Sequence, residues 1–331
     1  MAYIYKKVVG GKPYYYLRAS SVKNGKMMVK DIAYLGSSIS QAKDELSRLP
    51  KLKGKIEKSY RKISLFLESN HFLEEAEKAK PKEDEFLKEN LVIVEACALH
   101  YNKVFKKTDP LTKKEMLDNF LVEYAFNTTA IEGNTIGLKE ARDLLEDGLT
   151  PKGKTLREIY DLQNTKRVFE SLDFSQEISH ELIKKIHADL LENIDLRKEY
   201  RNRDIWVTNA RFKSTPFYRV KSDLDLLLKW HDESKKKIHT FVLATVFHHK
   251  FEKIHPFMDG NGRTGRMLMN FILMKNSHPP IIIQKKHRAE FLDALGIADE
   301  SAITEAKPEK YSELVAFSAS ELNESYWSNF L

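Results

Sequence analysis

The sequence predicts a mainly α-helical protein that begins with a small antiparallel β-meander. Beyond residue 62, apolar residues recur three and four positions apart, which is the spacing of one face of a helix. One such series is Met116, Leu117, Phe120, Leu121, Tyr124 and Ala125. The first 36 residues have a different pattern, because aromatic and β-branched runs alternate there with glycine pairs.

Three such runs predict the strands of the meander, at residues 3–5, 14–18 and 28–34. Gly10-Gly11 separates the first two runs, and Asn24-Gly25 separates the second and third. Asn-Gly is a strong signal for a tight hairpin turn, because both turn residues need positive φ. We therefore expect a separate β unit at residues 1–36.

Helices are expected over most of the remaining chain. Residues 37–62 are polar and lysine-rich, and their first serines favour a helix start. Residues 78–89 are charged and contain a proline, which is typical of a linker or exposed turn. We expect a helical region at 37–114 and a main domain at 115–331. Further series of apolar residues at helical spacing span residues 91–99, 241–248 and 267–272.

Composition excludes several classes of protein. With 42% hydrophobic and 31% charged residues, the 331-residue chain has the make-up of an ordinary globular protein. Its one cysteine, Cys97, cannot form an internal disulfide, which fits a reducing compartment. No apolar run reaches the roughly 18 residues of a membrane span, and the first residues lack the apolar core of a signal peptide. A cytoplasmic location is the expectation.

The positive charge is concentrated at the N-terminus. Residues 1–62 contain fifteen Lys and Arg against four acidic residues, whereas the rest contains 40 against 44. Lysine and arginine among aromatic residues can bind phosphates and stack on bases, but lysines also commonly solvate edge strands. A nucleic-acid-associated regulator that acts through this basic head is therefore the alternative to the enzymatic reading below.

The chemistry-bearing residues lie in one short string, His255 to Arg266, between two predicted helices. Pro256 ends the incoming helix and leaves His255 at its end. Gly260 and Gly262 allow a tight turn and bring backbone N–H groups toward a ligand. The next helix begins there, so its N-terminus adds an anion site.

Charged side chains complete this string. Arg263 and Arg266 lie three apart at the start of the helix, so both can reach one anion as forked donors. Asp259 fits beside an anion when a cation accompanies it, and Mg²⁺ with phosphates meets that condition. Histidine accepts a proton near neutral pH. A lone Gly-Asn-Gly is usually only a loop, but this combination indicates phosphoryl-type transfer.

The string His-Pro-Phe-Met-Asp-Gly-Asn-Gly-Arg-Thr-Gly-Arg resembles the signature of Fic-domain proteins at every position. The resemblance covers roughly residues 115–320. It includes residues 183–190, 200–207, 279–283 and 291–295, and leaves out the first hundred residues. It implies an all-helical Fic core, at about 175–300, that carries a β-hairpin flap.

The resemblance also implies an activity, the transfer of AMP from ATP to a Ser, Thr or Tyr hydroxyl of a protein. His255 would deprotonate that hydroxyl, and Asp259 would hold Mg²⁺ against the phosphates. The protein target cannot be read from the sequence. We expect the chain to modify itself, with a homodimer as a possible assembly, and we expect no membrane partner.

Roles in binding the phosphates follow from the same resemblance. Gly260, Asn261 and Gly262 would form the anion hole. Arg263 would steady the phosphate chain, and Arg266 would take the γ-phosphate.

The flap would occupy about residues 205–215 and dock the backbone of the target by strand addition. The residues that the resemblance assigns to this docking are Ile205, Trp206, Val207 and Thr208. Trp206 and Phe212 are equally consistent with buried packing residues.

A second motif, Thr128 to Asn134, resembles the inhibitory signature of Fic proteins. The string His255 to Arg266 is called here the catalytic string. Without it, Glu132 and Gly133 would be an ordinary helix end with glycine in the left-handed position. Because both motifs are present, an inhibitory helix at about 115–134 is expected. Glu132 would pair with Arg266 and occupy the space and charge meant for the γ-phosphate. The same carboxylate could serve removal of AMP from the target.

Overall fold

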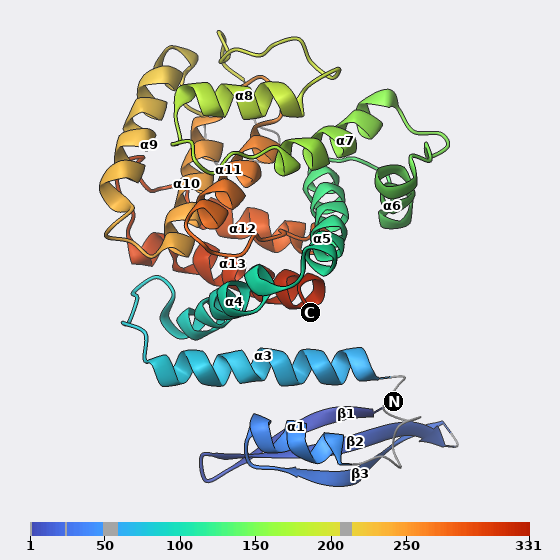
Figure 1. Cartoon of the computed structure of the whole chain (residues 1–331). Helices are drawn as coiled ribbons and strands as arrows, with labels where there is room; N and C mark the ends of the chain where they lie inside the picture. The colour runs from blue at the N-terminus through green and yellow to red at the C-terminus, as the bar shows by residue number, and fades with distance from the viewer. Residues whose placement is uncertain (1, 24, 49–58, 206–213) are drawn as a thin grey trace. The chain divides into compact units, whose positions relative to one another are not determined.

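The structure is a computed structural model that describes residues 2–23, 25–48, 59–205 and 214–331 (Figure 1). The chain divides into two compact units, one ending at Pro81 and the other spanning Lys82–Phe330. The division falls within the charged stretch 78–89 that the sequence suggested as a linker. No helix in the described ranges has the length and apolar character needed to cross a membrane.

The N-terminal unit is a three-stranded antiparallel sheet with two helices. The strands β1 (Ala2–Val9), β2 (Lys12–Lys23) and β3 (Lys26–Gly36) lie in sequence order, so the predicted meander is confirmed. The helices are α1 (Ile39–Ser47) and α3 (Tyr60–Ala79). Asn24 of the predicted turn lies outside the described residues.

One face of this sheet carries the core of the unit. Alternate residues of β1 and β2 are buried, because side chains of a strand point to opposite faces. They pack against the two helices in a cluster made of Ala2, Ile4, Tyr15, Leu17, Leu35, Ile39, Ala42, Ile63 and Leu67. The other face of the sheet has no residue in this cluster.

The second unit is helical. Its helices are α4 (Leu91–Lys103), α5 (Pro110–Ile131), α6 (Leu138–Asp147), α7 (Leu156–Glu170), α8 (His180–Leu190), α9 (Val220–Ser234), α10 (Thr240–Ile254), α11 (Asn261–Lys275), α12 (Arg288–Ala298) and α13 (Pro308–Asn329). The helical series predicted near residues 91, 116, 241 and 267 therefore correspond to α4, α5, α10 and α11. The mainly helical fold class is confirmed.

The helices α10 and α11 lie at the centre of this unit (Figure 1). Nearly every residue of both is buried, which is typical of a helix that is covered on all sides. α10 packs against α9, α11 and α13, whereas α11 packs against α5, α8 and α10. Residues 255–260 connect the two central helices, so the rigid core holds the catalytic string at both of its ends.

Candidate active site

The connection between α10 and α11 begins with an unusual backbone conformation at His255. α10 ends at Ile254, and His255 has φ +52°, in the left-handed region. This conformation costs a non-glycine residue roughly 1–2 kcal/mol, so the surroundings must hold it. Pro256 then prevents the helix from continuing.

Arg201 supplies part of that support. Its side chain is buried, and its Nε donates to the carbonyl oxygen of His255 at 2.8 Å. Its Nη2 donates to the carbonyls of both Ile254 (3.3 Å) and Thr215, and its Nη1 donates to the carbonyl of Arg203 at 3.1 Å. Arg201 thus joins the C-terminal end of α10 to the two chain segments, before residue 206 and after 213, that flank the expected flap.

The hydrogen bonding of His255 fixes which ring nitrogen is free. Nδ1 lies 3.2 Å from the backbone carbonyl of Glu252. A carbonyl oxygen only accepts, so Nδ1 carries the proton and Nε2 keeps its lone pair. Burial lowers the pKa of His255 to about 4, which leaves the ring neutral near pH 7. A neutral imidazole with a free Nε2 can act as a general base.

A largely buried carboxyl group, Glu252, lies near this imidazole. One of its oxygens is 3.9 Å from His255 Nδ1, and the other is 3.9 Å from His248 Nε2. Burial, followed by the charge of Glu132, raises the pKa of Glu252 to about 8. Sequence analysis did not single out Glu252, although its position three residues before His255 places both on one helix face.

The start of α11 is where the sequence predicts the anion site. Gly260 precedes the helix with φ +75°, and a Cβ there would lie 2.6 Å from the side chain of Leu191. Asn261 does not direct its side chain into the site. Its amide bonds both backbone groups of Phe257, at 2.8 and 2.9 Å, and thereby braces the loop. The first backbone N–H groups of a helix have no partner within the helix, so they are available as donors to an anion.

A carboxylate from the end of α5 lies at this helix start. Glu132 accepts a hydrogen bond from Arg266 at 2.7 Å, so the predicted ion pair is present. Glu132 also closely approaches the backbone of Gly262, where a Cβ would lie 2.0 Å from its carboxylate oxygen. The Arg266 side chain is 5% exposed, whereas Glu132 is 42% exposed, which leaves the carboxylate free to withdraw toward solvent.

Thr128 holds the same arginine from α5. Its hydroxyl accepts from Arg266 Nε at 2.7 Å, and its carbonyl accepts from Arg266 NH2 at 2.9 Å. Gly133 has φ +103°, which ends α5 directly after Glu132. The structure therefore brings Thr128 and Glu132 to Arg266 across more than 130 residues of sequence, whereas Gly133 only ends the helix.

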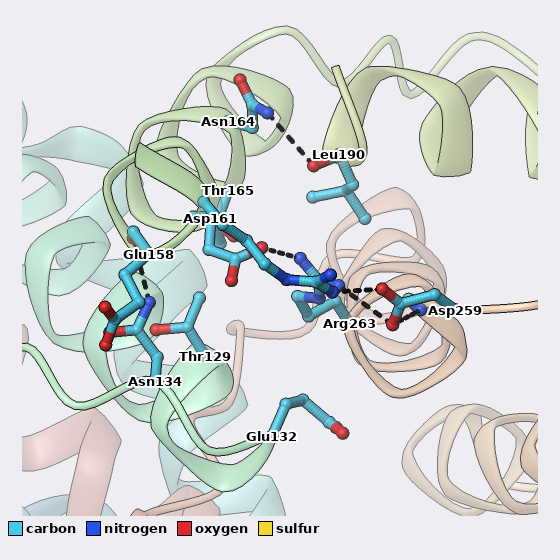
Figure 2. Close-up of polar contacts among 12 residues, drawn as sticks. Thr129, Glu132, Asn134, Glu158, Asp161, Asn164, Thr165, Leu190, Asp259 and Arg263 are labelled. Carbon is cyan, nitrogen blue, oxygen red and sulfur yellow. Dashed lines mark hydrogen bonds and ion pairs between the residues drawn. The ribbon is translucent and has the colours of Figure 1, made fainter. Parts of the chain in front are cut away.

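Asp259 is balanced by two guanidinium groups rather than standing alone (Figure 2). Arg157 of α7 pairs with one of its oxygens, and Arg263 lies 3.5 Å from the other. Burial acts to raise the pKa of Asp259, but Arg263 and then Arg157 bring it below the usual range. Arg263 is itself buried and also pairs with Asp161 of α7.

The roles of Arg157 and Asp161 were missed by sequence analysis. Each lies about a hundred residues before its partner, with no motif around it, so no local signal identifies the pair. The side chain of Arg263 is thus occupied by Asp161 on α7, at the side of the predicted phosphate site. Arg157 is largely exposed and can leave Asp259 without exposing a buried charge.

The residues present fit Mg²⁺. Asp259 is an oxygen ligand at the mouth of an anion site, and Mg²⁺ is commonly held by one or two carboxylates together with phosphates. One of its oxygens accepts from the N–H of Gly260 at 2.6 Å, and the other pairs with the largely exposed Arg157.

A cavity of about 470 Å³ opens beside these groups. His255, Glu132 and Arg266 line one part of it, and α12 lines another. The apolar lining from α12 comprises Phe291, Leu292, Leu295 and Gly296. Arg288 and Asp293 of the same helix also line it, so the α12 part is mainly rather than wholly apolar. A cavity with a charged end and a mainly apolar end matches a ligand that joins phosphates to an aromatic base.

Of the predicted flap, only its edges can be placed. Ile205 is half-buried, and its carbonyl accepts a hydrogen bond from the hydroxyl of Ser214 at 3.2 Å. Trp206, Val207, Thr208 and Phe212 lie outside the described residues.

These features define a mainly helical protein in which a largely buried histidine lies beside the N-terminus of the central helix α11. Comparison with known families identifies it further, because residues 177–273 match the Fic/DOC family. The chain therefore carries a Fic domain, and that domain contains the whole string from His255 to Arg266.

Curated relatives share this region. Protein adenylyltransferase fic-1 of Caenorhabditis elegans is 35% identical over 183 residues, which cover 53% of this chain and 36% of that protein. Protein adenylyltransferase Fic of Culex quinquefasciatus is 30% identical over 223 residues, covering 61% of this chain and 43% of the relative. The match thus spans less than half the length of these relatives.

Solved structures support the fold. A Fic-domain signalling protein from Bacteroides thetaiotaomicron superposes with a TM-score of 0.64 at 23% identity, covering 70% of this chain and 95% of that one. Fic-1 (residues 134–508) of C. elegans gives 0.60 at 27% identity, covering 72% and 71%.

Proposed function

We propose that the chain is a protein adenylyltransferase that moves AMP from ATP to a Ser, Thr or Tyr hydroxyl of a protein. The observation that carries the proposal is the neutral His255, whose free Nε2 lies beside an anion-binding helix start and an apolar cavity end. The names of the relatives support the same activity.

The residues suggest how the reaction proceeds. His255 Nε2 takes the proton of the target hydroxyl, whose oxygen then bonds to the α-phosphorus of ATP. The bond from the α-phosphorus to the bridging oxygen breaks, and pyrophosphate leaves. The N–H groups at the start of α11 stabilise the charge on the phosphate oxygens. Mg²⁺ held by Asp259 would neutralise phosphate charge.

Specific roles are proposed for the arginines and for Glu132. Arg266 would bind the γ-phosphate, and Arg263, fixed by Asp161, would support the phosphate site from one side. Glu132 occupies the Arg266 guanidinium, so it competes with the γ-phosphate and inhibits the enzyme in cis. We also propose that, when ATP is absent, the same carboxylate orients a water for removal of AMP.

Labelled ATP tests the activity. The chain is incubated with ATP carrying the label on the α-phosphate and, separately, on the γ-phosphate. Label from the α-position is expected on protein, including the chain itself, and none from the γ-position. Transfer of the γ-label would show a phosphotransferase and contradict the proposal.

The pH dependence of transfer should reflect the low pKa of His255. Because that pKa is about 4, the ring stays neutral from pH 8 to pH 6. Replacing Glu132 removes a charge that raises this pKa, so the base remains free in the Glu132→Gly variant. Its kcat/KM is expected to change less than about twofold over this range, whereas an ordinary histidine would cause a roughly fourfold loss at pH 6. A fall in kcat/KM with a midpoint near pH 6.5 would contradict the low pKa assigned to His255.

A further inference from the structure

The sheet of the N-terminal unit has a second face that the core does not use. Cross-strand partners lie on the same face of an antiparallel sheet. The register pairs Tyr5 with Tyr16 and Tyr16 with Tyr34, and Lys7 with Tyr14. This face, called here the tyrosine face, carries Tyr3, Tyr5, Tyr14, Tyr16 and Tyr34.

The rings of the tyrosine face lie side by side. Tyr34 is 6.5 Å from Tyr14 and 5.3 Å from Tyr16 between ring centroids. Arg18 lies over the ring of Tyr5, with its guanidinium carbon 3.5 Å from the centroid. Tyr34 remains 51% exposed. None of these tyrosines belongs to the core cluster with α1 and α3, so they form a platform on the face of the described sheet that lies opposite those helices.

The charge around this platform has one sign. Residues 2–36 contain seven Lys and Arg and a single acid, Asp31. Asp31 is paired with Arg18 at 2.5 Å, which leaves the lysines without acidic neighbours within the sheet. Lys7 and Lys12 lie on the tyrosine face itself. A polyanion with flat groups is the complementary ligand.

We propose that the tyrosine face binds single-stranded RNA. Unpaired bases can stack on the tyrosine rings, and the phosphates can meet Lys7 and Lys12. Each phenol adds a hydroxyl at the ring edge that can bond the ribose 2′-hydroxyl, which phenylalanine could not do. A duplex hides its base faces and cannot use the rings. This binding site goes beyond the transfer reaction, because it contains none of the catalytic string.

The open face of an antiparallel sheet is usually polar, because water covers it. Five large aromatic side chains there are not explained by the fold of this unit, whose core is complete on the opposite face. Solvated lysines alone would explain the charge but not the tyrosines.

The test uses the full chain and fluorescence anisotropy with labelled oligouridine of about 20 nucleotides at about 100 mM salt. Tyr34→Ala is expected to weaken binding at least about fivefold, since stacking on one aromatic ring is worth roughly 1–3 kcal/mol per base. Tyr60→Ala is the matched control, because Tyr60 is 67% exposed in the same unit and lies outside the sheet. Circular dichroism checks that each variant is folded.

Two further arms keep the test independent of one variant. Replacing Lys7 and Lys12 with Gln should reduce the slope of log affinity against log salt by about 1.4, or 0.7 for each phosphate contact. Duplex RNA should bind at least tenfold more weakly than the single strand, and the deoxy strand no more tightly than the ribo strand. Three results would each overturn the proposal. These are binding of duplex RNA as tight as that of the single strand, binding of the deoxy strand tighter than that of the ribo strand, and a loss of affinity in Tyr60→Ala equal to that in Tyr34→Ala.

Discussion

In a background without inhibition, Glu132→Gly, the further change His255→Ala is expected to reduce AMP transfer by about 10²–10⁴-fold, the usual effect of removing a general base. The reason is geometric. Nδ1 of His255 is occupied by the Glu252 carbonyl, so Nε2 is the nitrogen that can take the hydroxyl proton. The assay is incorporation of α-labelled ATP, and ATP affinity is measured alongside it.

The backbone of His255 requires a second variant. Its φ of +52° strains alanine, so a loss of activity in His255→Ala could reflect a displaced loop. Asparagine tolerates the left-handed region and cannot act as a base near neutral pH. His255→Asn should therefore lose transfer equally while it keeps the melting temperature and ATP binding. Substantial transfer by this folded variant would show that another group is the base.

The sequence predicted those parts of the site that are continuous or carry a motif. His255 to Arg266 is one continuous string whose residue types together indicate one kind of site. Within it, Pro256 and Gly260 mark where one helix ends and the next begins. The Glu132–Arg266 contact was predicted only because two motifs resemble parts of one family. Apolar periodicity also located the central helices, since α10 and α11 are buried along their length.

The remaining site residues could not be predicted, because their partners are distant in sequence. Arg157 and Asp161 reach the catalytic string only through the packing of α7, and Arg201 only through the ends of α10 and the flap segments. The sequence also predicted the start of helix α5 too far along the chain, at about residue 115 instead of Pro110. Periodicity begins at Met116, but Asp109 caps the helix by accepting from Thr112 at 3.0 Å, and Pro110 occupies its first turn.

The largest gain of activity is expected from Glu132→Gly alone. In the wild type, the Glu132 carboxylate lies on Arg266 and against Gly262, at the start of α11. A γ-phosphate brought to Arg266 would meet that carboxylate. Two unit charges about 4 Å apart interact by about 4 kcal/mol in a protein surface environment. Transfer is therefore expected to rise by ~10–10³-fold when the carboxylate is removed.

Two control variants separate the causes of that rise. Glu115→Gly lies on the exposed side of the same helix α5 and tests the effect of a glycine there. Glu132→Gln keeps the shape of the side chain and removes its charge. If charge repulsion causes inhibition, Glu132→Gln should be activated nearly as much as Glu132→Gly. If occupied space causes it, the glutamine variant should remain inhibited.

Nucleotide affinity provides a readout independent of transfer. Removing the Glu132 carboxylate frees the Arg266 guanidinium to bind the γ-phosphate. The Glu132→Gly variant should therefore bind ATP at least about tenfold more tightly than ADP, and the wild type should lack this preference. Adding Arg266→Ala should abolish the preference, because the guanidinium that meets the γ-phosphate is gone. Isothermal titration of the wild type, Glu132→Gly and the double variant with both nucleotides measures this directly. Equal labelling of wild type and Glu132→Gly, together with equal affinity for ATP and ADP in Glu132→Gly, would show that the ion pair is structural and not inhibitory.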